Sequence, residues 1–454
     1  MATVRVVQML LYAGTILFTY LLARRIFDRP AGMVAALMMA VPPVMVTLYT
    51  TVGIGAYGEA LLFGTCLLWL GHRLAHEWAG RWLGWLAWGA IAGLGFWSLG
   101  LIMVYIAPVT ILWLLRFERR LWPGYLVAVM GFLVCSSPWW IYDFTHNHAA
   151  MRVFYDPSSP VTVALPFSSL ERLGIFLLIG VPALVGFRFP WAADYVLVYL
   201  APAILAVYVI ALLSARRRWS TLSSAARHGM LLLVLLLAGF LLAFAVTRFG
   251  IDATGRYLLP LYPPLCIVVG GWWSELRSRK QVWGSLAIAF LLTFNLGSVA
   301  LAASRPAGLT TQFIPALQVG NKHDQALISF LLENDMPYGY SHHWVSFKIA
   351  FLSGEDVILA PLLPYLSRPS HDPSKPGRYP RYSEVAYSAQ NPVYVTTNQP
   401  WLDEMLRAGF AEQNVGFQEA TVGPYRVFHH LSRAVVPDQL GTLRVRDTYD
   451  DDRH

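Results

Sequence analysis

The sequence has few charged residues and few cysteines. Aspartate, glutamate, lysine and arginine make up 13% of its 454 residues, whereas soluble domains usually carry about a quarter. Its three cysteines, Cys66, Cys135 and Cys266, lie in apolar stretches without the spacing of a metal site or a disulfide framework. A nucleophile elbow or similar local motif is also missing, which disfavours a hydrolase. Most of this chain must therefore be solvated by something other than water, and a lipid bilayer is the simplest candidate.

The sequence contains many long apolar segments. Ten segments are long enough to cross a bilayer at about 1.5 Å per residue. They cover residues 7–23, 31–49, 58–71, 82–97, 99–115, 122–141, 194–213, 229–247, 257–274 and 281–303. The stretch from 82 to 115 is too long for one crossing, so we divide it at GFWSLG, residues 95–100. We expect a polytopic α-helical membrane protein with about ten spanning helices.

The net charge of +8 would be compatible with nucleic acid, but the basic residues fall in short clusters between the apolar runs. The clusters follow the first, third, fifth, seventh and ninth segments, and the other connectors carry few or no lysines and arginines. By the positive-inside rule the basic connectors face the cytoplasm. We therefore expect the protein to lie in a lipid bilayer and to bind no nucleic acid.

With ten crossings and basic connectors after every second segment, the N-terminus and residues 304–454 are predicted to lie outside the cytoplasm. Only six residues precede the first segment, so an outside N-terminus is unusual and favours a further helix and outer loop upstream of this sequence. The short stretch 173–187, broken by Gly180 and Pro182, would reverse the later parity if it crossed the membrane. We place it on the outer face as an interfacial or re-entrant element.

Residues 1–303 thus form the predicted transmembrane domain, and residues 304–454 a small soluble extracytoplasmic α/β domain. In the second domain DQALISFLLEND (324–335) has helical spacing, whereas VSFKIAFL, DVILAP, NPVYVTT and PYRVFHHL are typical of strands. Residues 368–384 are predicted to be a polar, proline-rich loop, and DTYDDDRH a disordered end.

Candidate site residues gather on the predicted outer side. Glu59 follows the glycine-rich, uncharged GIGAYG, whose backbone could approach a polar ligand closely; alternatively it is a carboxylate stabilised by a helix N-terminus. Arg256 is suited to bidentate phosphate binding or to anchoring at the membrane interface. We expect Pro263 and Pro264 to kink the ninth helix and open a crevice beside Arg256.

Asp143 at the end of WWIYDF and Arg152 in the predicted loop that follows are candidate substrate-binding residues, together with Tyr257 beside Arg256. His146 and His148 are two residues apart, which is a weak metal pattern, so solvated loop residues are the simpler interpretation. We assign no metal ligands, and a requirement for a divalent metal stays open.

The order of several motifs resembles a known family. RRIFDRPAGMVAALMMAVPP, GAYGEALLFGT, GLGFWSLGL, SSPWWIYDF and GRYLLPLYPP are similar to membrane glycosyltransferases of family 39 type, which have the GT-C fold and include protein O-mannosyltransferases and lipid A aminoarabinose transferases. The resemblance covers about residues 5–303 and, more loosely, the tail.

The resemblance implies transfer of a sugar from a polyprenyl-phosphate carrier to an acceptor at the outer face of the cytoplasmic membrane. Arg256 would hold the carrier phosphate, and Glu59 would correspond to a second acidic position of the outer loops. The family's general base lies in a first outer loop that this sequence lacks, so the chain as given would be incomplete as an enzyme. The alternative is a non-catalytic component of envelope assembly that binds or transports the lipid carrier.

Overall fold

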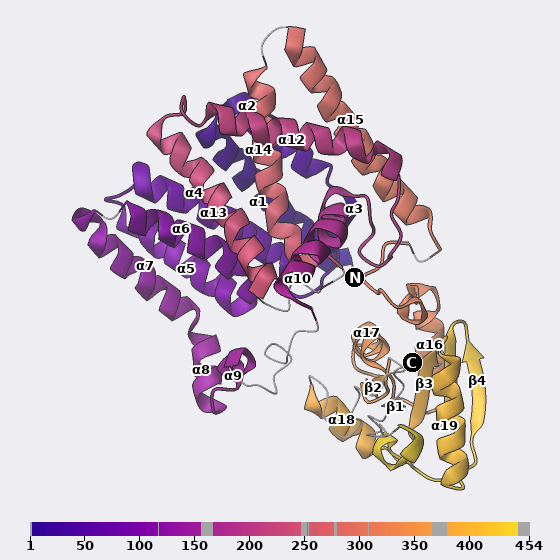
Figure 1. The fold of residues 1–454 in the computed structure, drawn as a ribbon. Coiled ribbons are helices and arrows are strands. Elements are labelled where there is room, and N and C mark those ends of the chain that lie inside the picture. Colours follow the sequence, from indigo (N-terminus) through magenta and orange to yellow (C-terminus); the bar gives the residue numbers. More distant parts are fainter. Residues whose placement is uncertain are drawn as a thin grey trace. The chain divides into compact units, whose positions relative to one another are not determined.

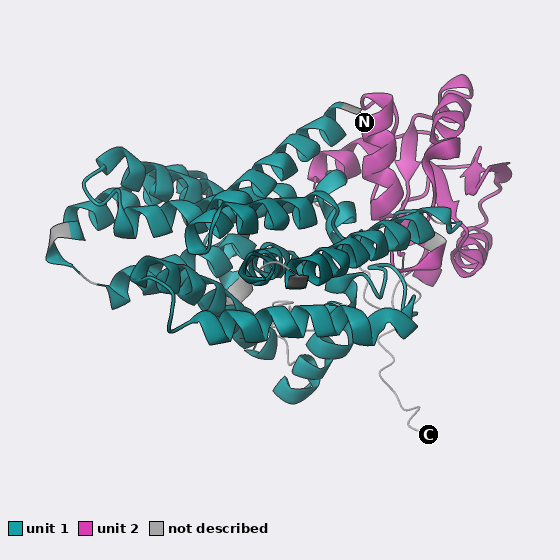
Figure 2. Ribbon diagram, turned by 90° about the horizontal axis from the view of Figure 1, so that it is seen from above, with its two compact units in different colours: residues 1–311 teal, residues 312–454 magenta. Residues whose placement is uncertain are grey.

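The structure is a computed structural model that describes residues 2–116, 118–155, 167–246, 252, 254–276, 279–306, 308–365 and 379–443. Its chain divides into two compact units, residues 1–311 and residues 312–454, which Figure 2 colours separately. Each unit has its own buried apolar core.

Unit 1 is helical, and its helices fall on all ten of the predicted segments (Figure 1). Its α-helices are α1 (Ala2–Ile26), α2 (Arg29–Ala40), α3 (Val44–Thr51), α4 (Tyr57–His76), α5 (Trp82–Ser98), α6 (Met103–Leu115), α7 (Trp122–Cys135), α8 (Ser137–Thr145), α9 (Ala149–Tyr155), α10 (Ser169–Ile175), α11 (Val181–Val185), α12 (Ala201–Arg218), α13 (Ser224–Val246), α14 (Tyr262–Glu275) and α15 (Arg279–Ser304). The expected break inside GFWSLG is present, because Leu99 is extended between α5 and the short helix η1 (Gly100–Ile102).

Four helical stretches of the described chain are long and apolar enough to cross a membrane by themselves: Thr3–Ile26, Val198–Arg218, Ser224–Val246 and Lys280–Ser304. The predicted spans 31–49 and 122–141 are not single straight helices. Each is a bent pair, with angles of 75° between α2 and α3 and 56° between α7 and α8. The bends fall beside Pro42 and Pro43 in the first pair and beside Pro138 in the second, where proline cannot continue the hydrogen-bonded ladder.

Glycines allow the helices of unit 1 to pack at short range. In the pair α5 and α7, a Cβ on Gly89 would overlap the carbonyl oxygen of Ala128, and one on Gly131 would come within 2.8 Å of the carbonyl oxygen of Leu86. Gly270 of α14 packs in the same way on the Ala31 carbonyl of α2. Small residues at such crossings are typical of helices that associate in a bilayer.

The expected kink in the ninth helix is absent from its described residues. Arg256–Leu261 form a 3₁₀ helix, η6, which contains Pro260, and α14 starts at Tyr262 with Pro263 and Pro264 in its first turn. The amide groups in the first turn of an α-helix have no hydrogen-bond partner within the helix, so proline, which lacks the amide proton, is tolerated there. The prolines therefore mark the start of α14 and do not bend it.

The stretch 173–187 forms a compound helix of α10, the π-helix η3 (Phe176–Gly180) and α11. It ends at Gly186, whose φ of +95° lies in the left-handed region, and the amide of Phe187 bonds back to the Pro182 carbonyl at 2.8 Å. Its interfacial or re-entrant placement stays a prediction.

Unit 2 is an α/β domain around a five-stranded sheet in the order β2-β1-β3-β5-β4. The strands are β1 (Tyr338–Tyr340), β2 (Ile358–Ala360), β3 (Val393–Thr397), β4 (Gln418–Val422) and β5 (Tyr425–His429). The first three are mutually parallel, and β5 and β4 form an antiparallel hairpin on β3. The helices are α16 (Asp324–Glu333), α17 (His343–Ser353), α18 (Pro380–Tyr387) and α19 (Pro400–Glu412).

Every residue of β3 is buried, because helices cover both faces of the sheet. One apolar core contains Val393 and Val395 with residues of α16 and α17, and the other contains Tyr394 with residues of α18 and α19. The predicted helix at 324–335 and the strands in DVILAP, NPVYVTT and PYRVFHHL are therefore confirmed.

Two predictions for unit 2 are wrong. VSFKIAFL is part of the helix α17, because its buried residues Val345, Ile349 and Ala350 recur at helical spacing. Residues 380–384 of the predicted polar loop belong to α18. The rest of that loop from 368 to 378, and the predicted disordered end at 447–454, lie outside the described residues.

Candidate functional site

The segment before Arg256 folds into a local turn held by Asp252. Its Oδ1 accepts a hydrogen bond from the Thr254 amide at 2.8 Å and another from the Thr254 hydroxyl. Gly255 follows with a φ of +73°, a conformation that strains residues with a Cβ. The turn delivers Arg256 as the first residue of η6, with its side chain directed back toward Asp252.

Arg256 and Asp252 form an ion pair four residues apart, with 2.9 Å between Nε and Oδ2. The Nε is buried and is not aligned for a hydrogen bond with any described residue, so the contact is electrostatic. The Arg256 side chain is nevertheless 34% exposed, against 13% for Asp252. The carboxylate therefore holds the guanidinium from one side and leaves part of it open to a second anion.

Three tyrosines form an aromatic wall next to Arg256. The guanidinium carbon lies 5.1 Å from the ring centre of Tyr257, and the rings of Tyr257, Tyr57 and Tyr49 follow one another at 6.5 and 5.5 Å. Tyr57 opens α4, and Tyr49 lies near the end of α3. The wall thus joins three segments, and more than two hundred residues separate Tyr49 from Tyr257 in the sequence.

Glu59 lies in the first turn of α4, two residues after Tyr57. Its Oε1 accepts a long hydrogen bond of 3.4 Å from Gln8 of α1, while Oε2 is buried without a hydrogen-bond partner among the described residues. A buried carboxylate oxygen costs free energy unless a donor reaches it. The geometry is compatible with both roles predicted for Glu59. The helix N-terminus stabilises its negative charge, and Oε2 can accept a hydrogen bond from a hydroxyl group of a ligand.

Asp143 and Arg152 lie on the neighbouring short helices α8 and α9. Asp143 is buried, and its oxygens accept from the Met151 amide at 2.8 Å and contact His148 Nδ1 at 2.9 Å. These contacts hold the turn between α8 and α9. Arg152 is exposed on α9. A role for these two residues in substrate binding stays a prediction.

The described residues contain no group of three or more His, Cys, Asp or Glu side chains that could hold a metal ion. The ring of His146 stacks on Tyr142 at 4.2 Å, whereas His148 contacts Asp143. The two histidines therefore have different partners.

Sequence reasoning singled out Arg256, Tyr257 and Glu59 but missed Tyr49 and the role of Asp252. The spacing of Asp252 and Arg256, four residues apart in DATGR, was the available signal for the ion pair. Nothing in the sequence signals Tyr49, because an aromatic residue at the end of an apolar run looks the same whether it packs in a core or lines a site.

Among solved structures, the chain is similar to the crystal structure of ArnT from Cupriavidus metallidurans in the apo state. The TM-score is 0.52 at 15% sequence identity, and the match covers 94% of this chain and 83% of that one. Together with the helical bundle and the α/β unit, this match shows a GT-C fold. The fold class predicted from the sequence is confirmed.

Residues 1–142 match the family model described as dolichyl-phosphate-mannose-protein mannosyltransferase. The undecaprenyl phosphate-alpha-4-amino-4-deoxy-L-arabinose arabinosyl transferase of Pseudomonas aeruginosa strain UCBPP-PA14 is 27% identical over an alignment of 316 residues, and the match covers 66% of this chain and 51% of that protein. The protein of the same name from Pseudomonas paraeruginosa is 30% identical over an alignment of 170 residues, and the match covers 32% of this chain and 29% of that protein. The resemblance to membrane glycosyltransferases with the GT-C fold is confirmed, and the chain spans about half the length of the first of these relatives.

Proposed function

We propose that this protein acts in the transfer of a sugar from a polyprenyl-phosphate carrier to an acceptor hydroxyl at the outer face of the cytoplasmic membrane. The observation that carries the proposal is the partly open guanidinium of Arg256, held by Asp252 beside the tyrosine wall. The names of the similar transferases support a polyprenyl-phosphate-linked sugar as donor.

In this reaction the oxygen of the acceptor hydroxyl attacks the anomeric carbon, the bond between that carbon and the phosphate oxygen breaks, and the hydroxyl proton is released to solvent or to the departing phosphate. Negative charge grows on the departing phosphate, which becomes the polyprenyl phosphate product. The exposed part of the Arg256 guanidinium is suited to stabilise that charge through charge-assisted hydrogen bonds. Asp252 fixes the direction of the guanidinium, so little side-chain entropy is lost when the phosphate binds.

Glu59 is assigned to recognition of a hydroxyl group on the sugar or on the acceptor. Its buried Oε2 lacks a donor among the described residues, and an O–H group would satisfy it. The proposal assigns no general base within this chain.

The proposal predicts that Arg256→Ala weakens binding of undecaprenyl phosphate by about tenfold or more, because hydrogen bonds to charged groups contribute about 1.5–3 kcal/mol. Binding to the purified full chain in detergent can be measured by titration. Arg256→Lys should recover only part of the affinity, because an ammonium cannot form the bidentate contact.

The control is Arg217→Ala, which removes an exposed arginine at the end of α12 and should leave binding unchanged. Glu59→Gln should retain binding of the carrier and lower sugar transfer where transfer is measurable. Unchanged affinity in Arg256→Ala would disprove the phosphate role. Carrier binding without any transfer would favour the non-catalytic carrier-binding function.

A further inference from the structure

A second feature lies at the other end of α4, away from the Arg256 site. Tyr57 and Glu59 open this helix, and Arg73 and His76 close it. A helix of 20 residues is about 30 Å long, which is close to the thickness of the hydrocarbon core of a bilayer. Features at the end of α4 therefore belong to the opposite side of the bundle from Arg256.

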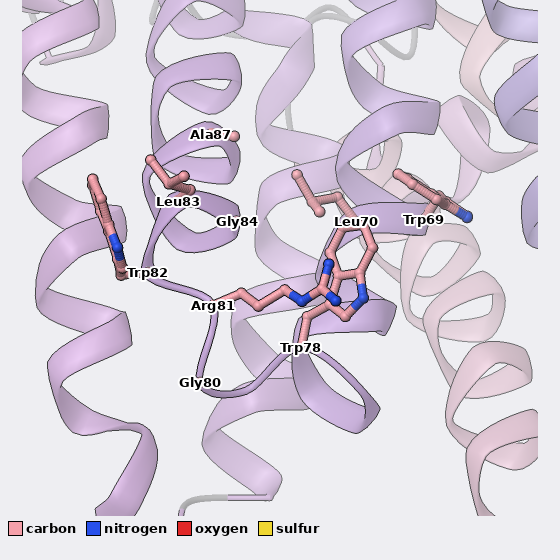
Figure 3. Close-up of a pocket in the computed structure, with 9 residues that line it drawn as sticks. All are labelled: Trp69, Leu70, Trp78, Gly80, Arg81, Trp82, Leu83, Gly84 and Ala87. Carbon is pink, nitrogen blue, oxygen red and sulfur yellow. The ribbon is translucent and has the colours of Figure 1, made fainter.

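At that end a hollow of about 630 Å³ opens between α4, the connector that follows it and the start of α5. Its lining includes Trp69, Leu70, Trp78, Arg81, Leu83 and Ala87 (Figure 3). The lining is almost entirely apolar, and Arg81 is its one charged residue. A hollow with this composition suits a molecule that is apolar over most of its length and charged at one end.

Two guanidinium groups fix the aromatic rim of this hollow. The indole of Trp78 has Arg73 at 3.7 Å and Arg81 at 4.9 Å from its ring centre, and the Arg81 side chain reaches from the connector to this ring (Figure 3). Trp69 meets Trp78 edge-on at 6.0 Å. Cation–π contacts of this kind hold a guanidinium in place while its N–H groups stay available for an anion.

The charges around the rim are not balanced. Glu77 lies 2.8 Å from Arg25 and 3.2 Å from Arg73, so one carboxylate serves two guanidinium groups. Arg81 is exposed and forms no ion pair with a carboxylate of the described residues. The rim thus carries an excess of positive charge, concentrated on Arg81.

The hollow continues onto a helix face that suits lipid tails. Trp82 and Leu83 at the start of α5 are each 61% exposed, and Leu86 one turn further is 37% exposed. In a bilayer this arrangement puts tryptophan and arginine at the headgroup level and leucine at the level of the acyl chains.

We propose that this hollow binds a membrane phospholipid with an anionic headgroup. The headgroup phosphate contacts the guanidinium of Arg81, and one acyl chain lies along Leu70, Leu83 and Ala87. The charge imbalance selects an anionic lipid over a zwitterionic one, and the apolar hollow selects a lipid over a free phosphate. The site is independent of the proposed sugar transfer.

The test is native mass spectrometry of the purified full chain with added palmitoyl-oleoyl phosphatidylglycerol or the matching phosphatidylcholine. We expect the wild-type protein to retain one more phosphatidylglycerol than phosphatidylcholine. Arg81→Gln should lower the affinity for phosphatidylglycerol by about fivefold, since an arginine near an anionic lipid surface contributes about that factor. Ala87→Phe should weaken it as well, because the added ring fills the hollow while Arg81 keeps its charge.

Arg217→Gln is the matched control, since it removes one positive charge from another exposed basic cluster, at the end of α12, and should leave retention unchanged. Equal losses in Arg81→Gln and Arg217→Gln would overturn the proposal, because general charge would then explain binding. Full retention in Ala87→Phe would also overturn it, because the hollow would then hold no acyl chain. Thermal unfolding of each variant checks that the fold is intact.

Discussion

Single residues of this protein owe their properties to their neighbours, and His342 in unit 2 is a clear case. It lies between β1 and α17, and its Nε2 is 2.8 Å from the Thr397 hydroxyl at the end of β3. Only 1% of the residue is exposed. Burial lowers the pKa of His342 from 6.5 to about 3, and the charges of Lys348 and His343 act in the same direction.

This depressed pKa predicts that unit 2 loses stability in mild acid. The unfolded chain takes up a proton on His342 near pH 6.5, whereas the folded chain does not do so until about pH 3. The contribution of neutral His342 to the free energy of unfolding is therefore fully present above pH 6.5. It is lost as the pH falls toward 3, by on the order of 1 kcal/mol per pH unit. Hydrogen exchange of β1 and β3 in the full chain, corrected for intrinsic rates, measures this loss.

His342→Asn should remove this part of the pH dependence, because asparagine does not titrate. His430→Asn is the control, since His430 is exposed and its φ of +49° suits asparagine. The interpretation fails if exchange in the His342 variant accelerates between pH 7.5 and 5.5 as steeply as in the wild type.

At the scale of elements, the apolar pattern of the sequence predicted the long helices, because a bilayer demands long apolar runs. It failed for VSFKIAFL, where Val345 and Ile349 share one buried helical face and a short apolar run fits a strand equally well. The candidate site was likewise predictable only in part. Arg256 was visible as a charge at the end of an apolar run, but the turn through Thr254 that aims it depends on hydrogen bonds that no pattern records.

Close packing of α5 on α7 provides a prediction at this scale. Gly89→Ala should destabilise unit 1 by about 1–3 kcal/mol, because the new methyl group meets the backbone oxygen of Ala128 and a backbone atom yields less readily than a side chain. The midpoint of thermal unfolding in detergent should fall accordingly.

Gly239→Ala supplies the comparison within α13, where a Cβ would have no heavy atom within 4 Å. That change should leave the midpoint the same or raise it, since alanine has the higher helix propensity. Equal midpoints for the two variants would show that the contact between α5 and α7 does not require glycine.

For the whole molecule, alternating arginine clusters predict which side of the membrane each connector occupies. An alkaline phosphatase fusion after Ala303 should be active, because the chain there is predicted to lie outside the cytoplasm. A fusion after Trp219, directly behind the cluster Arg216, Arg217 and Arg218, should be inactive. The opposite result at Ala303 would contradict the predicted outside location of unit 2 and would remove the basis for placing the Arg256 site at the outer face.

The prolines of η6 and α14 have a consequence for how the protein meets its ligand. Pro260, Pro263 and Pro264 have restricted φ angles and no amide protons, so the segment that follows Arg256 has few alternative conformations. The entropy of ordering this segment is lost while the chain folds, before any carrier arrives. The carrier lipid proposed to bind beside Arg256 would therefore meet a surface already shaped for it, which favours rapid capture without a preceding rearrangement.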